Sequence, residues 1–386
     1  MILNNLDIIG QGKKQCIRLA DNSIREITDE VQQSVNDLAL NFENAIAFPG
    51  LINSHDHLDF NCFPRLGNHR YGNYVDWGID IHSQNKEQIK KVLKIPQELR
   101  IKWGIYKNLL NGITTVVNHG AKLDVENDLI SVFQECHSIH SVRLDKYWKI
   151  RLNLPRKDRL PFVSHVGEGT DTASNSEINE LLRWNISRRE LIGVHGVSMD
   201  KKQAAKFSAL VWSPDSNFFL LNKTASVDEL KKHCTILFGT DSALTGSWNL
   251  FEQLRIARAT GMASDEEIYN MLTTSPAKIW NLKDRGSIEQ GMRADLVVAK
   301  QQDKLMPLDS FFNLNPEDIL LVVTEGDIKL FDESLIQQLK DQHYSTNSFS
   351  SILINKARKF VKGNLPEMMK MMESYNPEIL FPVQVS

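Results

Sequence analysis

The chain has 386 residues, of which 41% are hydrophobic and 24% are charged, a composition typical of a globular protein with a large buried core. The 45 lysines and arginines and the 48 aspartates and glutamates give a formal net charge of −3, which offers no basic surface for nucleic acid or an acidic membrane. The N-terminal residues carry neither a basic stretch nor a long apolar run, so we expect no signal peptide, no membrane span and a cytoplasmic location.

The two flanks of the chain have strand-like patterns. Residues 1–48 contain short apolar runs broken by Asn, Asp and Gly, and similar runs lie at 294–299 and 319–324. Because chain ends commonly meet, we expect 1–48 and 284–340 to form one small β domain, a β-sandwich. The last segment, 341–386, is rich in Lys and Met at helical spacing, and we expect a helical tail there.

Between the flanks, apolar runs of strand length alternate with amphipathic stretches of helical length. The runs lie at 113–117, 162–165, 191–195, 210–212 and 235–238. This alternation predicts a parallel sheet with crossover helices.

Two histidines, His55 and His57, follow one such apolar run. Extended residues two apart point to the same side, so both imidazoles can face one ion. Taken alone the pair is weak evidence, because surface histidine pairs are common.

Four further polar residues stand at the carboxyl ends of predicted strands: His165, Glu168, His195 and Asp241. An α/β barrel places its chemistry at this end of its strands. Three His and one Asp suit zinc or iron and leave a position for water, which ionises near about pH 7 on such an ion. Glu168 and His195 then remain for proton transfer and oxyanion support.

Seven motifs occur in order: Pro49–His57, Gly112–Val116, His165–Glu168, Val194–Gly196, Trp212–Asn217, Gly239–Ser242 and Gly291–Leu296. Together they resemble the metal-dependent amidohydrolase superfamily, and within it the branch of cyclic-amidine deaminases and triazine chlorohydrolases. The resemblance covers about 45–300 and implies a (β/α)8 TIM-like barrel over 49–283.

The resemblance also implies roles for the polar residues. One divalent ion, zinc with iron as the alternative, would be held by His55, His57, His165 and Asp241. His195 would contact the bound water or the substrate, Glu168 would shuttle the proton, and Asp241 would also accept the water's proton. No lysine stands where two-metal members carry a carboxylated bridge, so a single ion is expected.

One region departs from the family pattern. The segment between His119 and His165 is too short for the usual strand and helix units, since a parallel crossover needs about a dozen residues or more. We therefore expect a barrel abbreviated around its third and fourth units. The exposed flank would be covered by the segment after Phe349 or by a second subunit in a homo-oligomer.

The remaining candidate residues also have ordinary structural explanations. His119 fits either the pocket or a core position bonded to backbone. Surface or structural roles are expected for His69, His82, His137, His140, His233 and His343. The basic cluster at 156–159 fits a solvated loop better than a site for an anionic group.

These observations predict a hydrolase in which metal-bound hydroxide deaminates an aminated heterocycle, a small-molecule substrate. One alternative is hydrolysis of a cyclic or linear amide C–N bond at the same site. The other is a non-catalytic metal-binding scaffold, which would be expected to lack some of the six key residues.

Overall fold

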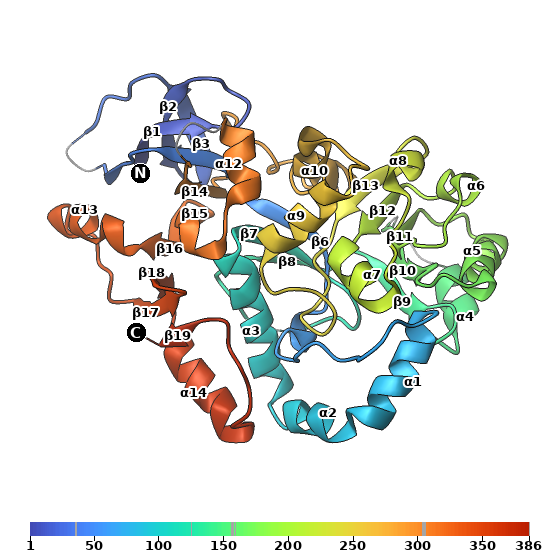
Figure 1. Ribbon diagram of the computed structural model, residues 1–386. Helices are drawn as coiled ribbons and strands as arrows, with labels where there is room; N and C mark the ends of the chain where they lie inside the picture. The colour runs from blue at the N-terminus through green and yellow to red at the C-terminus, as the bar shows by residue number, and fades with distance from the viewer. Residues whose placement is uncertain (35–36, 125, 156–157, 159, 303–305, 386) are drawn as a thin grey trace.

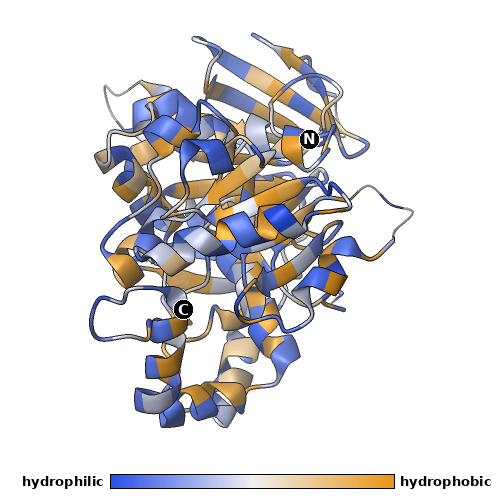
Figure 2. Cartoon of the chain, turned by 90° about the vertical axis from the view of Figure 1, so that its right-hand side faces the viewer, coloured by the Kyte–Doolittle hydropathy of each residue, from blue (hydrophilic) through white to orange (hydrophobic). Residues whose placement is uncertain are grey.

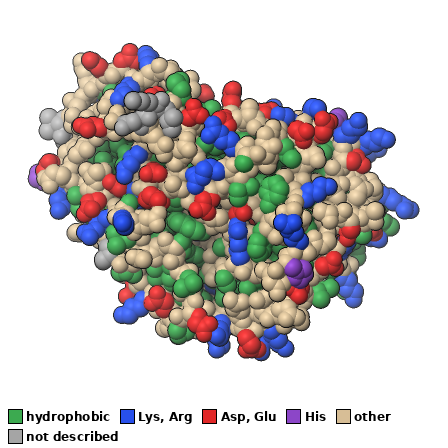
Figure 3. Space-filling model, in the orientation of Figure 1, with side chains coloured by type: hydrophobic (Ala, Val, Ile, Leu, Met, Phe, Trp, Pro, Cys, Tyr) green, Lys and Arg blue, Asp and Glu red, His purple; other side chains and the backbone are tan. Residues whose placement is uncertain are grey.

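The computed structural model describes residues 1–34, 37–124, 126–155, 158, 160–302 and 306–385. Both ends of the chain contribute to a large sheet, and a mixed α/β part lies beside it (Figure 1). Most of the basic cluster at 156–159 lies outside the described residues. Acidic and basic side chains are interspersed on the face in Figure 3, as the small net charge predicts. Within the described part of the chain, no helix has the length and apolar character needed to cross a bilayer.

The large sheet joins the two ends of the chain, as expected. Its pivotal contact is the antiparallel pairing of β5 (Ala45–Pro49) with β14 (Leu296–Lys300). Among the described residues the order is β19-β17-β18-β16-β15-β14-β5-β1-β2-β3, with β4 beside β1. The remaining bounds are β1 Ile2–Ile8, β2 Lys14–Ala20, β3 Ser23–Thr28, β4 Ala39–Asn41, β15 Ile319–Thr324, β16 Asp327–Asp332, β17 Phe349–Ile354, β18 Ala357–Lys362 and β19 Gln384–Val385.

The prediction of a helical tail over 341–386 is wrong for its middle part. Strands β17 and β18 form a hairpin whose turn is Asn355–Lys356, and Asn355 has φ 53°. A short asparagine turn between two runs of alternating burial favours a hairpin over a helix. Helix α14 (Leu365–Tyr375) follows, capped by the Asn364 side chain. The boundaries of the expected domains stay a prediction.

The middle of the chain contains two parallel sheets. Strands β6 (Leu51–Asp56), β7 (Ile113–Asn118) and β8 (Ser131–Phe133) form one. The other has the order β13-β12-β11-β10-β9, with bounds β9 His137–Ser141, β10 Phe162–Val166, β11 Leu191–His195, β12 Ala209–Trp212 and β13 Thr235–Phe238. Strands β6, β7, β10, β11 and β12 are buried along their whole length, which explains why apolar residues do not simply alternate with polar ones in them. Figure 2 shows apolar strands at the centre with helices of mixed hydropathy around them.

Helices separate most of these strands. They are α1 Tyr74–Gln84, α2 Lys86–Leu93, α3 Gln97–Leu110, α4 Trp148–Asn153, α5 Thr172–Trp184, α6 Lys201–Ala204, α7 Pro214–Leu221, α8 Val227–Leu230, α9 Leu250–Ala259, α10 Asp265–Asn270, α11 Thr274–Ile279, α12 Pro307–Asn313 and α13 Ile336–Asp341. Short 3-10 turns lie at η1 Leu58–Phe60, η2 Pro316–Asp318 and η3 Glu333–Leu335. The described residues between β7 and β9 contain no helix, which agrees with the expected loss of crossover helices in this region.

Candidate metal centre

The two histidines that follow the first parallel strand lie side by side. His55 is the last but one residue of β6 and His57 comes directly after this strand, and their ring centroids are 4.9 Å apart. His165 on β10 lies across from them, with its ring centroid 5.0 Å from that of His55 and 5.5 Å from that of His57. The structure thus brings the three predicted imidazole ligands together from two separate sheets.

Asp241, just beyond β13, completes the group. Its Oδ1 atom lies 3.9 Å from Nε2 of His55 and 4.0 Å from Nε2 of His57. The Oδ2 atom accepts hydrogen bonds from the hydroxyls of Ser216 (2.8 Å) and Thr245 (3.1 Å), which fix the carboxylate. Burial opposes ionisation, but His195, His57 and these hydrogen bonds outweigh it and hold the pKa of Asp241 below its usual value.

Glu168 and His195 face each other beside this group. The Oε2 atom of Glu168 lies 3.5 Å from Nε2 of His195 and 3.6 Å from Nδ1 of His165. Burial, with Asp241 and Glu177 nearby, raises the pKa of Glu168 well above its ordinary value. A carboxyl group in this state can hold a proton near neutral pH, as proton transfer requires.

Burial disfavours the charged form of four histidines in the cluster. Burial and neighbouring imidazoles lower the pKa of His55, His119 and His165 well below the ordinary value, and burial lowers that of His195 to about 4. His195 (φ 71°) and Asp241 (φ 55°) both adopt left-handed backbone conformations. Non-glycine residues in this region carry strain that folds retain mainly at functional sites.

Buried ring nitrogens without hydrogen-bond partners mark the site as suited to a metal ion. They include Nε2 of His55, both ring nitrogens of His165 and Nε2 of His195. Such orphaned atoms are rare in folded proteins and call for a bound group. Potential ligand atoms of His55, His57 and Asp241 all lie within 4.8 Å of one another, as do those of His55, His165 and His195. Neutral imidazoles with one carboxylate form the donor set that zinc prefers.

His195 belongs to one of these groups by distance, but its hydrogen bonding favours another role. The side-chain amide of Asn217 lies 2.9 Å from Nδ1 of His195, and the oxygen of that amide accepts from the Thr224 hydroxyl at 3.2 Å. The amide nitrogen therefore donates to Nδ1, so the proton of the neutral ring lies on Nε2. A protonated Nε2 donates a hydrogen bond and does not bind a metal ion.

Two more histidines border the cluster. The ring of His119 stacks on that of His165 with centroids 4.7 Å apart, and its Nε2 is also buried without a partner, which favours the pocket alternative. His140 was expected at the surface or in a structural role, and it is exposed, but its ring centroid lies 4.5 Å from that of His165. It lies one residue before the end of the short strand β9, and that position was the available signal.

Comparisons with known proteins agree with this geometry. Residues 159–329 match the model of the Amidohydrolase family. The matched segment includes His165, Glu168, His195 and Asp241 of the candidate site. The predicted resemblance is confirmed, and with it the class of enzyme, a hydrolase of carbon–nitrogen bonds other than peptide bonds.

Relatives and solved structures extend the similarity over most of the chain. A 5-methylthioadenosine/S-adenosylhomocysteine deaminase from Caldicellulosiruptor saccharolyticus is 22% identical, covering 84% of this chain and 92% of the relative. A zinc-bound adenosine deaminase from Xanthomonas campestris aligns with a TM-score of 0.72 at 13% identity, covering 97% of each chain. A zinc-bound atrazine chlorohydrolase from Arthrobacter aurescens aligns with a TM-score of 0.64 at 16% identity, covering 89% of this chain and 99% of the other.

Proposed function

We propose that this amidohydrolase is a zinc-dependent deaminase of an aminated heterocycle. The observation that carries the proposal is the facing arrangement of neutral imidazoles, ionised Asp241 and a Glu168 whose pKa is raised. In this assignment His55, His57, His165 and Asp241 hold one ion. Zinc, when bound, supplies Lewis acidity and makes hydroxide available near neutral pH.

The side chains beside the ligands have separate tasks in this proposal. Glu168, within 3.5–3.6 Å of both His195 and His165, takes one proton from water and delivers it to the ring nitrogen, and it then carries a second proton, released by the added hydroxyl group, to the departing amine. His195 presents Nε2–H to the oxygen on which negative charge develops. Asp241 stays ionised and can accept that second proton from the added hydroxyl group before it reaches the amine. Side chains of this protein thus accept and donate the protons that move during deamination.

The nearby lysine is not available to bridge two metal ions. Lys107 reaches the same region, but its ammonium group lies 3.1 Å from Oδ2 of Asp56 and 3.0 Å from Oγ1 of Thr240. A lysine committed to these partners does not bridge two metals, which supports the proposal of one ion per chain. Iron in place of zinc is the alternative that metal analysis distinguishes.

The relatives suggest where to look for the substrate. They are named as deaminases of 5-methylthioadenosine, S-adenosylhomocysteine, 5'-deoxyadenosine and adenosine, so aminopurine nucleosides are the first class to test. Hydrolysis of a cyclic or linear amide is the second candidate, because the same residues serve it. A non-catalytic scaffold is disfavoured because Glu168 and His195 are retained beside the ligands.

We also infer the finer architecture. The two parallel sheets together make a barrel abbreviated around units three and four, supported by the hydrogen bond from Asp241 N to His55 O (3.1 Å) across the gap between β13 and β6. Domain limits of 1–48 with 284–340 and of 49–283, the β-sandwich form of the small domain, a homo-oligomeric state and a cytoplasmic location stay predictions.

One experiment tests the function. Purified protein loaded with zinc is offered adenosine, 5'-deoxyadenosine, guanine, an aminotriazine and a panel of cyclic amides, and ammonia release and ring opening are measured separately. Ammonia release from an aminated heterocycle, lost on chelation, is expected. Ring opening of amides without ammonia release would replace the proposal with the second candidate. Zinc binding without any turnover would favour the scaffold.

A further inference from the structure

A buried ion pair lies behind the candidate metal centre. Lys107 on α3 and Asp56 at the end of β6 have side chains that are 1% and 0% exposed, and Nζ lies 3.1 Å from Oδ2. Asp56 stands between His55 and His57 in the sequence, but it belongs to neither candidate ligand group. A charge pair withdrawn so completely from water persists only when its remaining hydrogen bonds are satisfied.

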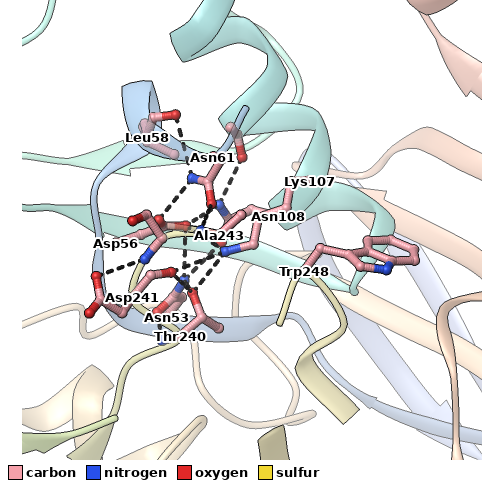
Figure 4. Close-up of polar contacts among 12 residues, drawn as sticks. Asn53, Asp56, Leu58, Asn61, Lys107, Asn108, Thr240, Asp241, Ala243 and Trp248 are labelled. Carbon is pink, nitrogen blue, oxygen red and sulfur yellow. Dashed lines mark hydrogen bonds and ion pairs between the residues drawn. The ribbon is translucent and has the colours of Figure 1, made fainter. Parts of the chain in front are cut away.

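Lys107 has two further partners, and both belong to the other side of the metal centre. Its Nζ atom donates to Oγ1 of Thr240 at 3.0 Å and to the backbone carbonyl of Asp241 at 3.3 Å. The Thr240 hydroxyl donates to the same carbonyl at 2.9 Å. One ammonium group therefore connects the strand that carries two candidate ligands with the residue that supplies the carboxylate (Figure 4).

Asparagine side chains complete this network. Asn108 donates to Asp56 Oδ2 at 2.8 Å, and Asn61 donates to Asp56 Oδ1 at 2.9 Å. Asn53 donates to Thr240 Oγ1 at 2.8 Å and accepts from the Thr240 amide at 3.0 Å. Each oxygen of the Asp56 carboxylate thus accepts a hydrogen bond from an asparagine. Asn53 adds a second connection, besides Lys107, between β6 and Thr240.

The network lies where the sheets leave a gap. Strands β6 and β13 belong to different sheets among the described residues, so no hydrogen-bonded ladder sets their spacing. The backbone of Asp241 is nevertheless held at both polar groups, because its N–H donates to the His55 carbonyl at 3.1 Å and its carbonyl accepts from Lys107 and Thr240. A residue with φ 55° keeps that conformation only when its surroundings fix it.

We propose that Lys107 is a positioning residue of the metal centre. Paired with Asp56, it holds the backbone of Asp241 against the strand of His55 and His57, so that the carboxylate and the imidazoles stay directed at one ion. The inference rests on the proposed metal binding and adds to it a residue that contacts neither ion nor substrate. It predicts that metal affinity depends on side chains outside the ligand set.

Two variants test the proposal on the whole chain. Lys107→Met combined with Asp56→Asn removes both charges, so that no unpaired charge is left buried. Thr240→Val keeps both charges and the side-chain shape but removes the hydroxyl through which Lys107 and Asn53 meet. Zinc affinity is measured on metal-free protein by competition with a chromophoric chelator, and the ligand geometry is read from the absorption spectrum of the cobalt-substituted protein.

We expect both variants to bind zinc about 10- to 100-fold more weakly than the parent and to show an altered cobalt spectrum. If the charge-free variant does not fold, Thr240→Val decides the matter, since it retains the ion pair. Zinc affinity and cobalt spectra equal to those of the parent would overturn the positioning role.

The chain offers a matched control in a second buried ion pair. Lys359 on β18 is fully buried and its Nζ lies 2.6 Å from Oδ2 of Asp332, in the large sheet that joins the chain ends. Lys359→Met combined with Asp332→Asn should lower the urea midpoint of unfolding but leave zinc affinity unchanged. An equal loss of zinc affinity in this control would show that stability alone explains the effect and would overturn the proposal.

The outcomes also separate this inference from the proposed function. A parent protein that binds zinc but deaminates nothing defeats the function while leaving the affinity comparison intact. A parent that deaminates its substrate, with variants of unchanged zinc affinity, defeats only the role of Lys107.

Discussion

The side-chain amide of Asn217 donates to Nδ1 of His195 over 2.9 Å and so keeps the ring proton on Nε2, the nitrogen that faces Glu168. The ring is fully buried and its pKa is lowered to about 4, so it stays neutral at physiological pH. His195 therefore presents a donor at Nε2, beside the buried ring nitrogens of His55 and His165 that have no partner. This difference in hydrogen bonding distinguishes His195 from the candidate metal ligands of the same cluster.

Replacing His195 tests that distinction. His195→Ala should keep zinc bound at the parental stoichiometry, while kcat falls about 10²- to 10³-fold, the cost of losing one donor to a developing oxyanion. Metal analysis and steady-state kinetics on the same preparation measure both quantities. Loss of the ion from this variant would instead identify His195 as a ligand.

His165 should behave in the opposite way. Both of its ring nitrogens are buried without a hydrogen-bond partner, so His165→Ala removes a ligand and little else. We expect about one transition-metal ion per chain in the parent and loss of most of it in the variant, measured by elemental analysis. The exposed His233 provides the control, and His233→Ala should retain the ion. Two ions per parent chain would contradict the single-metal proposal.

Glu168→Gln tests proton transfer apart from metal binding. Glutamine keeps the volume and hydrogen bonding of the side chain but cannot carry the proton, so kcat should fall by about 10²- to 10⁴-fold with the zinc content unchanged. The measurement is ammonia release from a substrate that the parent converts. Turnover close to that of the parent, or loss of the metal, would show that the assigned role is wrong.

The metal-free protein should lose stability as the pH falls below about 6.5. The pKa values of His55, His119, His140, His165 and His195 are lowered in the folded state, so the unfolded chain binds more protons there. Each proton taken up only on unfolding costs the native state about 1.4 kcal/mol per pH unit below the unfolded pKa. The raised pKa values of Glu168 and Glu177 act in the opposite direction but concern fewer groups. The midpoint of urea unfolding, measured between pH 7.5 and 5.5, shows which group of residues dominates. A midpoint that rises as the pH falls would refute the predicted loss of stability.

The predictable parts of the site were those with a fixed local spacing. His55 and His165 lie next to the last residues of their strands, and His57 and Asp241 lie just beyond theirs; parallel strands place such residues at one edge. The closeness of the exposed His140 to His165 was not predicted, because β9 is short and follows β8 after three residues, without the helix that normally signals a new unit. Strands β17 and β18 were missed because the Lys and Met pattern masked a two-residue turn.

Lys107 was beyond prediction for a different reason. It lies in the last turn of α3, where a lysine ordinarily faces water. Only the tertiary structure shows that its partner is Asp56, from a strand far earlier in the chain, and that Thr240 comes from much later. Pairings between distant positions leave no local periodicity to detect.

The pairing of β5 with β14 has a consequence for synthesis of the protein. Pro49 lies opposite Leu296, and only Gly50 separates β5 from β6, the strand that bears His55. A ribosome has therefore made more than half of the chain before the antiparallel partner of β5 emerges. Closing so long a loop is slow, and β5 keeps one edge unpaired until then. The segment that leads into the His55 strand accordingly acquires its second neighbouring strand only late in synthesis.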